Sequence, residues 1–257
     1  MTTLATVITG ASSGIGEALA HLFAPEQQTL VLVARRKERL DALAKELNAK
    51  HGIKVHVIAQ DLQEIGAAAN LMNSIANLNL TVDTLVNNAG FGISAPFAKS
   101  DGVKTSAMMQ LNMVALTELT HMALPAMLER RHGRIMNIAS VAAFQACPYF
   151  AVYAATKAYV LSFTEALAAE VTDRGILVTA VCPGSTDTSF HEVANTKGSL
   201  VDKISESPEM VADEAYKALN NGKVVVVTGL FNKPLPVINR LIPRKTMTWA
   251  VGKMMGR

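Results

Sequence analysis

Short apolar runs alternate with longer amphipathic segments along most of this chain. The short runs are rich in Val, Ile, Leu and Thr and are apolar almost throughout, as strands covered on both faces of a sheet require. They predict strands at Leu4–Thr9, Thr29–Ala34, Lys54–Ala59, Thr81–Asn87, Arg134–Ala139, Ile176–Cys182 and Lys223–Thr228. Helical periodicity between them predicts helices at Gly14–Phe23, Lys37–Lys50, Ile65–Ala76, Val103–Arg130, Phe150–Asp173 and Pro208–Asn220.

This alternation of strand and helix predicts an α/β fold. Right-handed crossovers turn it into a Rossmann-type, doubly wound parallel sheet of about seven strands, with helices on both faces. We predict a single domain over residues 1–231, followed by an extension at Asn232–Arg257 that packs on the same domain. One further segment, Gly184–Ser207, is polar and irregular, as expected of a flexible loop over a site.

The composition excludes several classes of protein. Half of the residues are apolar and 18% are charged, which suits a buried core rather than disorder. A formal charge of +3 indicates no nucleic-acid partner. Cys147 and Cys182 do not have metal-ligand spacing, and the histidines are scattered, so we predict no metal site. The lack of a signal peptide and of an apolar stretch of about 18 residues predicts a cytoplasmic protein in a reducing compartment.

The C-terminal extension is apolar and basic. Eight of the 24 basic residues, and none of the 21 acidic ones, lie from Ala215 onward. Three interpretations are open: the extension folds over a substrate pocket, packs at a subunit interface, or lies on a membrane surface as a basic amphipathic segment. We rank the first two above peripheral membrane contact, because a bare apolar patch of this size is costly.

A glycine loop follows the first predicted strand and opens the first predicted helix. It reads Gly10, Ala11, Ser12, Ser13, Gly14, Ile15 and Gly16. Glycines at such a turn let the backbone approach a pyrophosphate, and the helix N-terminus offers N–H groups and a partial positive charge to phosphates. Placed between a strand and a helix, the loop favours dinucleotide binding over an ordinary turn.

The end of the second strand indicates which dinucleotide is bound. An NAD-binding site of this type usually has an acidic residue there for the ribose hydroxyls, whereas this chain has Arg35 and Arg36. A guanidinium pairs instead with a 2′-phosphate, so we predict NADP(H), bound mainly through Arg35. Arg36 either contributes or is a solvated residue at the start of a helix.

Polar residues also follow the third and fourth strands. Asp61, followed by Leu62, either accepts a hydrogen bond from the adenine amino group or caps the next helix. Asn88, in the run Asn87 to Gly90, either satisfies backbone groups or contacts the cofactor.

Tyr153 and Lys157 are four residues apart on a predicted helix and therefore share one face. Reduction of a carbonyl needs a proton for the new alkoxide, and a free phenol has a pKa of about 10. A lysine cation at about 5 Å should favour the phenolate by roughly 3 kcal/mol and bring the pKa toward neutrality. We predict Tyr153 as the general acid and base, and Lys157 as its partner and as a ligand of the nicotinamide ribose.

Two further residues complete the candidate constellation. Ser140 follows the fifth strand, where its hydroxyl can hydrogen-bond a developing oxyanion. Asn112 lies inside a predicted helix, where Asn is unfavourable. Its presence makes sense if its amide, or a kinked carbonyl, orders a water near Lys157, although on this residue alone a surface asparagine is the simpler interpretation.

Together these residues resemble the classical branch of the short-chain dehydrogenase/reductase superfamily, over about the first 190 residues. The resemblance implies that Asn112, Ser140, Tyr153 and Lys157 form the catalytic tetrad. It also implies that the cofactor is lined by Ile15, Leu62, Ala89, Gly90, Pro183, Gly184, Thr186 and Thr188, with Thr188 on the nicotinamide carboxamide. Thr186 stands where the family more often has Val or Ile. A homo-oligomer, either a dimer or a tetramer, is expected by the same resemblance.

The substrate is specified least. Expected pocket residues are mainly apolar, as in most ligand sites, and favour a small hydrophobic carbonyl or secondary alcohol. They are Phe91, Ile93, Val141, Phe144, Cys147, Tyr149 and Phe190, with Gln145 and His191 as polar additions. We predict an NADP(H)-dependent carbonyl reductase. The alternatives are a 3-oxoacyl-thioester reductase of fatty-acid metabolism and a non-catalytic NADP(H)-binding sensor or scaffold.

Overall fold

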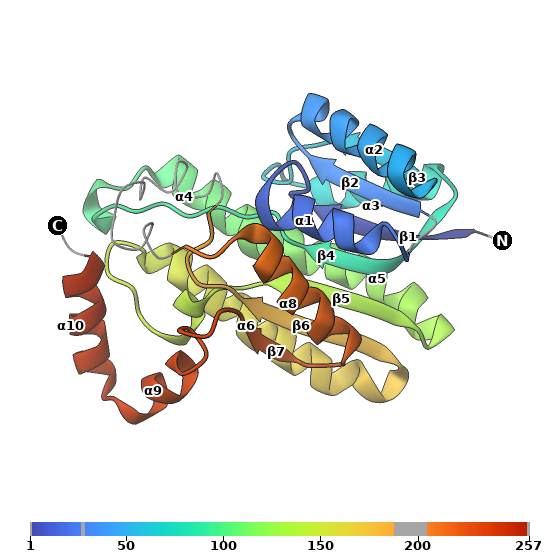
Figure 1. Cartoon of the computed structure of the whole chain (residues 1–257). Helices are drawn as coiled ribbons and strands as arrows, with labels where there is room; N and C mark the ends of the chain where they lie inside the picture. Colours follow the sequence, from blue (N-terminus) through green and yellow to red (C-terminus); the bar gives the residue numbers. More distant parts are fainter. Residues whose placement is uncertain (1, 27–28, 188–204, 256–257) are drawn as a thin grey trace.

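A computed structural model describes residues 2–26, 29–187 and 205–255 of the chain. Its strands form a single sheet in which every neighbouring pair is parallel, in the order β3-β2-β1-β4-β5-β6-β7 (Figure 1). The strands are β1 (Thr3–Thr9), β2 (Thr29–Ala34), β3 (Lys54–Ala59), β4 (Leu80–Asn87), β5 (Gly133–Ile138), β6 (Ile176–Cys182) and β7 (Val225–Val227). The order reverses between β1 and β4, which makes the carboxyl ends of these two strands the expected ligand crevice.

Helices cover both faces of this sheet. One face packs against α1 (Gly14–Phe23), α2 (Lys37–His51) and α8 (Pro208–Asn220). The other packs against α3 (Ala67–Asn77), α5 (Leu116–Arg130) and α6 (Ala151–Val171). Because successive strand side chains alternate between faces, Leu32 joins the first core and Val31 the second. The predicted doubly wound Rossmann-type fold is confirmed.

Two short helices, α9 (Leu235–Leu241) and α10 (Arg244–Met255), form the C-terminal extension. They lie at the end of the molecule opposite the N-terminus (Figure 1). The amide of Asn239 on α9 donates a 2.6 Å hydrogen bond to Gln145, and Val251 of α10 is buried against Cys147 and Phe150. The extension therefore packs on the segment that connects β5 to α6.

Some predicted boundaries were wrong. The last strand spans Val225–Val227 and not Lys223–Thr228, because the chain is still in a turn at Gly222, which has a φ of +66°. Helix α3 begins at Ala67 and not at Ile65, since Ile65 is 93% exposed and Gly66 is left-handed. Asp61 therefore does not cap that helix; its carboxylate accepts a hydrogen bond from the N–H of Gln63.

The long helix predicted at Val103–Arg130 is interrupted. It consists of α4 (Gly102–Met109), a π-helical segment (Gln110–Ala115) and α5. The π segment contains Asn112, the residue that conflicts with ordinary helix preference. Such local π geometry is rare and is frequent at functional sites, because it re-aims side chains on either side of it.

A row of buried polar side chains crosses the middle of the sheet. The amide of Asn87 on β4 donates to the hydroxyl of Thr120 at 3.0 Å and to the amide oxygen of Asn137 on β5 at 2.9 Å. Asn137 in turn donates to Thr164 on α6 at 3.0 Å. Since these groups are buried, each donor needs its partner, and the row fixes how α5 and α6 sit on the two strands.

Replacing Asn137 by Ala should lower the free energy of unfolding by about 2 kcal/mol. The substitution removes a hydrogen-bond partner from the buried side chains of Asn87 and Thr164. Chemical denaturation monitored by circular dichroism measures the change. Asn73→Ala, at an exposed position of α3, is the matched control and should change stability by less than about 0.5 kcal/mol. Equal effects of the two substitutions would contradict a structural role for the row.

Candidate active site

The glycine loop is fastened to the end of β4 by Asn88. The side-chain amide of Asn88 donates to the carbonyl oxygens of Thr9 at 2.9 Å and Gly10 at 3.2 Å. The hydroxyl of Thr9 accepts hydrogen bonds from the N–H groups of Asn88 and Ala89, both at 3.0 Å, and donates to Val86. Of the two roles open to Asn88, this geometry supports the satisfaction of backbone groups.

This contact explains two of the loop glycines. A Cβ on Gly16 would lie 2.5 Å from both the Asn88 amide nitrogen and the Gly10 carbonyl oxygen. A Cβ on Gly10 would lie 2.7 Å from the same amide nitrogen, and the φ of Gly10 is +67°. A side chain at either position would push β1 and β4 apart, so the loop can stay close to the sheet only with glycine.

Arg36 reaches back over the glycine loop. Its guanidinium donates to the hydroxyl of Ser12 at 3.0 Å and to the hydroxyl of Ser13 at 2.7 Å. Arg35 instead approaches Asp61, with 3.6 Å between Arg35 Nη1 and the carboxylate. Desolvation by burial and the nearby charges of Arg39 and Arg35 lower the pKa of Arg36. An additional anion beside these two arginines would relieve that repulsion.

Asn112 is buried and not a surface residue; 2% of it is exposed. Its amide group forms a pair of hydrogen bonds with the backbone of Phe91, accepting from its N–H at 3.2 Å and donating to its carbonyl at 3.0 Å. It also donates to the hydroxyl of Thr156 on α6 at 3.1 Å. The side chain of Asn112 therefore ties the segment after β4 to the helix that carries Tyr153 and Lys157.

Lys157 is buried beside Gly90 and the end of β5. Its ammonium donates to the carbonyl oxygen of Ile138 at 2.7 Å and lies 5.8 Å from the centre of the Tyr153 ring. A Cβ on Gly90 would lie 3.5 Å from the Lys157 nitrogen and 3.0 Å from the Asn112 amide oxygen. The absence of a side chain at Gly90 leaves room over this nitrogen and this oxygen.

Tyr153 on α6 and Ser140 after β5 lie close to each other. The Ser140 hydroxyl accepts a hydrogen bond from the N–H of Ala142 at 3.1 Å, and it shares a hydrogen bond with Tyr153. The Tyr153 ring packs edge-on against Phe150, with 5.7 Å between ring centres. The four predicted catalytic residues thus come together from the π segment, the end of β5 and α6.

The expected lowering of the tyrosine pKa is not found. Burial raises the pKa of Tyr153 to about 12, and the hydrogen bond with Ser140 offsets only part of this. Burial also lowers the pKa of Lys157 to about 8. Desolvation is the largest cause of both shifts and outweighs the expected effect of the lysine cation on the phenol.

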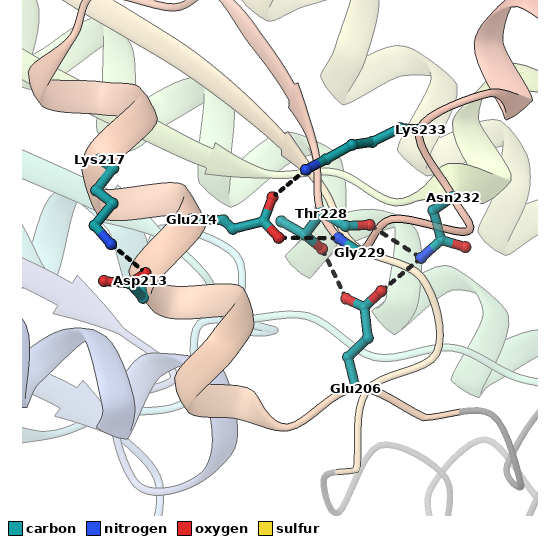
Figure 2. A network of polar contacts seen from close by, with 8 residues as sticks. All are labelled: Glu206, Asp213, Glu214, Lys217, Thr228, Gly229, Asn232 and Lys233. Atoms are coloured by element: carbon teal, nitrogen blue, oxygen red, sulfur yellow. Dashed lines mark hydrogen bonds and ion pairs between the residues drawn. The ribbon is translucent and has the colours of Figure 1, made fainter.

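The turn after β6 is held by a network that the motifs did not indicate (Figure 2). The carboxylate of Glu206 accepts hydrogen bonds from Thr228 at 3.0 Å and from the Asn232 amide at 2.8 Å. A Cβ on Gly184 would lie 2.3 Å from the same Asn232 amide nitrogen. The backbone of Glu206 exchanges hydrogen bonds with Ser185 and Asp187 on either side of Thr186.

A second carboxylate, that of Glu214 on α8, strengthens this network. It accepts a hydrogen bond from the N–H of Gly229 at 3.3 Å and pairs with Lys233 at 3.2 Å (Figure 2). Isolated Glu and Asn residues carry no periodic or motif signal, so only their meeting in space reveals them. The network joins Gly184 and Thr186, which the resemblance places near the nicotinamide, to the start of the C-terminal extension.

The predicted substrate residues have mixed outcomes. Phe91 lies beside Asn112, and Tyr149 is half-exposed with a left-handed φ of +67°. Gln145 is engaged by Asn239. Burial raises the pKa of Cys147 to about 11, which suits the predicted packing residue rather than a nucleophile. Thr188, Phe190 and His191 lie outside the described residues.

These residues fit a nicotinamide dinucleotide. The side-chain-free surface at Gly90, the guanidinium beside Ser12 and Ser13, and the buried ammonium of Lys157 lie at the carboxyl ends of β1, β4 and β5. Among the described residues no group of three or more His, Cys, Asp or Glu side chains could hold a metal ion. In the same residues no helix is both long and apolar enough to cross a membrane.

Gly16→Ala should lower the free energy of unfolding by about 1–3 kcal/mol, because the new methyl group meets backbone and the Asn88 amide. It should also weaken binding of NADPH, measured by fluorescence titration. Gly102→Ala is the matched control, since its Cβ would meet nothing within 4 Å. A Gly16 variant that binds NADPH as tightly as Gly102→Ala does would show that the close approach is unimportant.

Comparisons with known proteins agree with this geometry. Residues 5–198 match the short chain dehydrogenase family. The ketoacyl reductase HetN of Nostoc sp. is 31% identical over 99% of this chain and 85% of its own length. Sulfoacetaldehyde reductase 2 of Chromohalobacter salexigens is 37% identical over 72% of this chain and 73% of its own length.

Two solved structures extend the comparison to the fold. A short-chain dehydrogenase from Sphingobium yanoikuyae in complex with NADPH is 31% identical, with a TM-score of 0.81 over 98% of this chain and 95% of that one. A 7β-hydroxysteroid dehydrogenase is 26% identical, with a TM-score of 0.86 over 98% and 97% of the two chains. With its parallel sheet, its glycine loop and its Ser140, Tyr153 and Lys157 cluster, this chain belongs to the short-chain dehydrogenase family of oxidoreductases.

Proposed function

We propose that this protein is an NADP(H)-dependent oxidoreductase that interconverts a carbonyl and a secondary alcohol, with Tyr153 as the general acid and base. The observation that carries the proposal is the meeting of Ser140, Tyr153 and Lys157 at the carboxyl end of β5, beside the turn after β6. Ser140 supports this placement, because its hydroxyl also lies 3.5 Å from the Pro183 carbonyl oxygen in that turn.

Each residue then has a separate task. The nicotinamide, when bound, supplies or accepts the hydride. Ser140 donates a hydrogen bond to the carbonyl oxygen as negative charge develops on it. Tyr153 transfers its hydroxyl proton to that oxygen, and Lys157 would hold the ribose hydroxyls of a bound nicotinamide nucleotide while it stays bonded to Ile138.

The protonation state of Tyr153 favours reduction. With a pKa raised to about 12, the phenol keeps its proton throughout the neutral range in the protein without ligand. An alkoxide is more basic than a phenolate, so proton transfer from Tyr153 to the new alkoxide is downhill. The reverse reaction needs the phenolate and should become faster as the pH rises.

The choice of NADP(H) rests on the two arginines after β2. Arg36 donates hydrogen bonds to Ser12 and Ser13 of the glycine loop, and Arg35 lies beside Asp61. A 2′-phosphate bound between Arg35 and Arg36 would contact both guanidinium groups. The likeness to the Sphingobium enzyme, which has NADPH in its structure, supports the same choice. We propose that both arginines contribute, with Arg36 the one already fixed on the loop.

A 3-oxoacyl thioester is a second candidate substrate. The observation that favours it is the likeness to the ketoacyl reductase HetN over nearly the whole chain. The apolar side chains of Phe91 and Phe144 and the half-exposed Tyr149 favour a small hydrophobic ketone at least as well. A screen of ketones, aldehydes and 3-oxo esters, followed by NADPH oxidation, ranks the two candidates.

Tyr153→Phe should lower kcat for carbonyl reduction by about 100-fold or more, since it removes the proton donor, while the affinity for NADPH stays the same. Tyr159→Phe, on the exposed side of the same helix, is the control and should retain wild-type turnover. Full activity of the Tyr153 variant would overturn the assigned acid. A wild-type protein that binds NADPH and reduces no carbonyl would favour the sensor or scaffold.

Arg36→Ala should lower kcat/KM with NADPH by about tenfold or more and leave kcat/KM with NADH nearly unchanged, because it removes charge-assisted hydrogen bonds that only the 2′-phosphate accepts. Arg35→Ala tests the other guanidinium in the same assay. Arg39→Ala, an exposed residue on α2, is the control for loss of a positive charge. A wild-type enzyme that works equally well with NADH would refute the proposed specificity.

A further inference from the structure

Thr156 is a buried residue of α6 that lies between Tyr153 and Lys157 in the sequence; 1% of it is exposed. The sequence patterns did not indicate it as a site residue. Its hydroxyl donates a 2.7 Å hydrogen bond to the carbonyl oxygen of Tyr153, three residues earlier. The same hydroxyl oxygen accepts a 3.1 Å hydrogen bond from the side-chain amide of Asn112. One hydroxyl therefore connects the backbone of the proposed proton donor to the π segment.

The two hydrogen bonds of Thr156 have fixed directions. A hydroxyl has a single proton, and the proton of Thr156 is used on the Tyr153 carbonyl, which can only accept. Toward Asn112 the Thr156 oxygen can therefore only accept, so the Asn112 atom that faces it must be the amide nitrogen. An amide turned by half a rotation would bring two oxygens together with no proton between them. Thr156 thus selects one of the two orientations of the Asn112 amide.

The backbone of Phe91 depends on the same orientation. The amide nitrogen of Asn112 also donates to the Phe91 carbonyl, and its amide oxygen accepts from the Phe91 N–H. The reversed amide would set oxygen against oxygen and N–H against N–H, so both hydrogen bonds would be lost. Because Asn112 is buried, water does not readily replace these partners. The Thr156 hydroxyl therefore holds the Phe91 backbone through Asn112.

This orientation also places an acceptor near the ammonium of Lys157. The Asn112 amide oxygen and the Lys157 nitrogen lie 3.0 Å and 3.5 Å from the point that a Cβ on Gly90 would occupy. An amide oxygen carries partial negative charge and stabilises a nearby cation, whereas the amide NH2 group would repel it. The choice that Thr156 makes for Asn112 therefore suits the charged form of Lys157.

Thr164 makes the same kind of contact about two turns further along α6. Its hydroxyl donates to the Val160 carbonyl at 2.6 Å and accepts from the Asn137 amide at 3.0 Å. Thr164 is buried as Thr156 is, but its partner belongs to the polar row in the middle of the sheet. The chain therefore offers two matched threonine and asparagine pairs on one helix, and only the pair formed by Thr156 and Asn112 adjoins Lys157.

We propose that Thr156 is a positioning residue whose hydroxyl fixes the Asn112 amide, and through it the Phe91 backbone, beside Lys157. The proposal deepens the proposed function, because its effect on turnover rests on the oxidoreductase activity. Thr156 acts through Asn112 and is assigned no contact with substrate or cofactor. Its contribution to the rate comes from holding neighbouring groups in the productive geometry, on which turnover depends steeply.

Thr156→Val tests this role, because valine has the same branched shape and no hydroxyl. It should lower kcat for the best ketone of the screen by about tenfold, since the Asn112 amide is no longer held in one orientation. Thr156→Ser keeps the hydroxyl and should stay within about twofold of the wild type. Thr164→Val is the matched control: it removes an equivalent buried hydrogen bond and should lower stability similarly, with kcat within about twofold of the wild type.

Amide hydrogen exchange gives a second readout that does not require turnover. Measured by NMR without cofactor, exchange of the Phe91 N–H should be about tenfold faster in Thr156→Val, because its acceptor on Asn112 is no longer fixed. The wild type, Thr156→Ser and Thr164→Val should protect this N–H equally. Thr156→Ala, which also lacks the hydroxyl and adds no methyl group toward Asn112, replaces Thr156→Val if the valine variant does not fold.

The outcomes separate this proposal from the proposed function. Slow turnover and fast Phe91 exchange in Thr156→Val, and in neither Thr156→Ser nor Thr164→Val, would support the positioning role. Equal kcat and equal Phe91 exchange in Thr156→Val and Thr164→Val would overturn it, as would a serine variant as impaired as the valine variant. If the wild type reduces no carbonyl, the proposed function fails, and exchange of the Phe91 N–H alone decides whether Thr156 fixes Asn112.

Discussion

The contact between the glycine loop and Asn88 sets the geometry of the whole site. It lies where the strand order reverses, so the connections that follow β1 and β4 leave to opposite faces of the sheet and frame a crevice between them. Asn88 bridges that crevice at its base through the carbonyls of Thr9 and Gly10. The loop therefore approaches the sheet closely enough to expose its backbone, and Gly10 and Gly16 are the residues that make this approach sterically possible.

Burial is the largest cause of the shifted pKa values of Tyr153 and Lys157. Both groups are withdrawn from water, which favours the neutral phenol and lowers the cost of deprotonating the amine. Lys157 offsets part of its desolvation by donating to Ile138, and Ser140 does the same for Tyr153. The neutral phenol is the form that a reductase needs before proton transfer, so this electrostatic arrangement suits the proposed direction.

Segments distant in sequence complete the site. The π segment places Asn112 between Phe91 and α6, the Glu206 network ties the turn after β6 to the start of the extension, and α10 covers the segment before α6. In each case a side chain from one segment beyond the strand ends contacts and stabilises another such segment. This organisation is expected of α/β folds, whose sheets are rigid and whose ligand-binding residues lie on the loops beyond the strand ends.

The sequence by itself determined the fold, the order of the strands along the chain and the candidate catalytic side chains. The periodicity of strands and helices reflects which side chains are buried, and it can be recognised within a short stretch of sequence. The spacing of Tyr153 and Lys157 involves a single helix, so it too can be recognised from residues close together in the chain. Tertiary structure decided the rest. The π segment at Asn112, the contacts of Asn88 and Arg36, the Glu206 network and the packing of α10 on Phe150 all depend on groups brought together from separate elements. The pKa values were decided in the same way, because desolvation depends on everything packed around Tyr153 and Lys157 and not on the four residues that separate them.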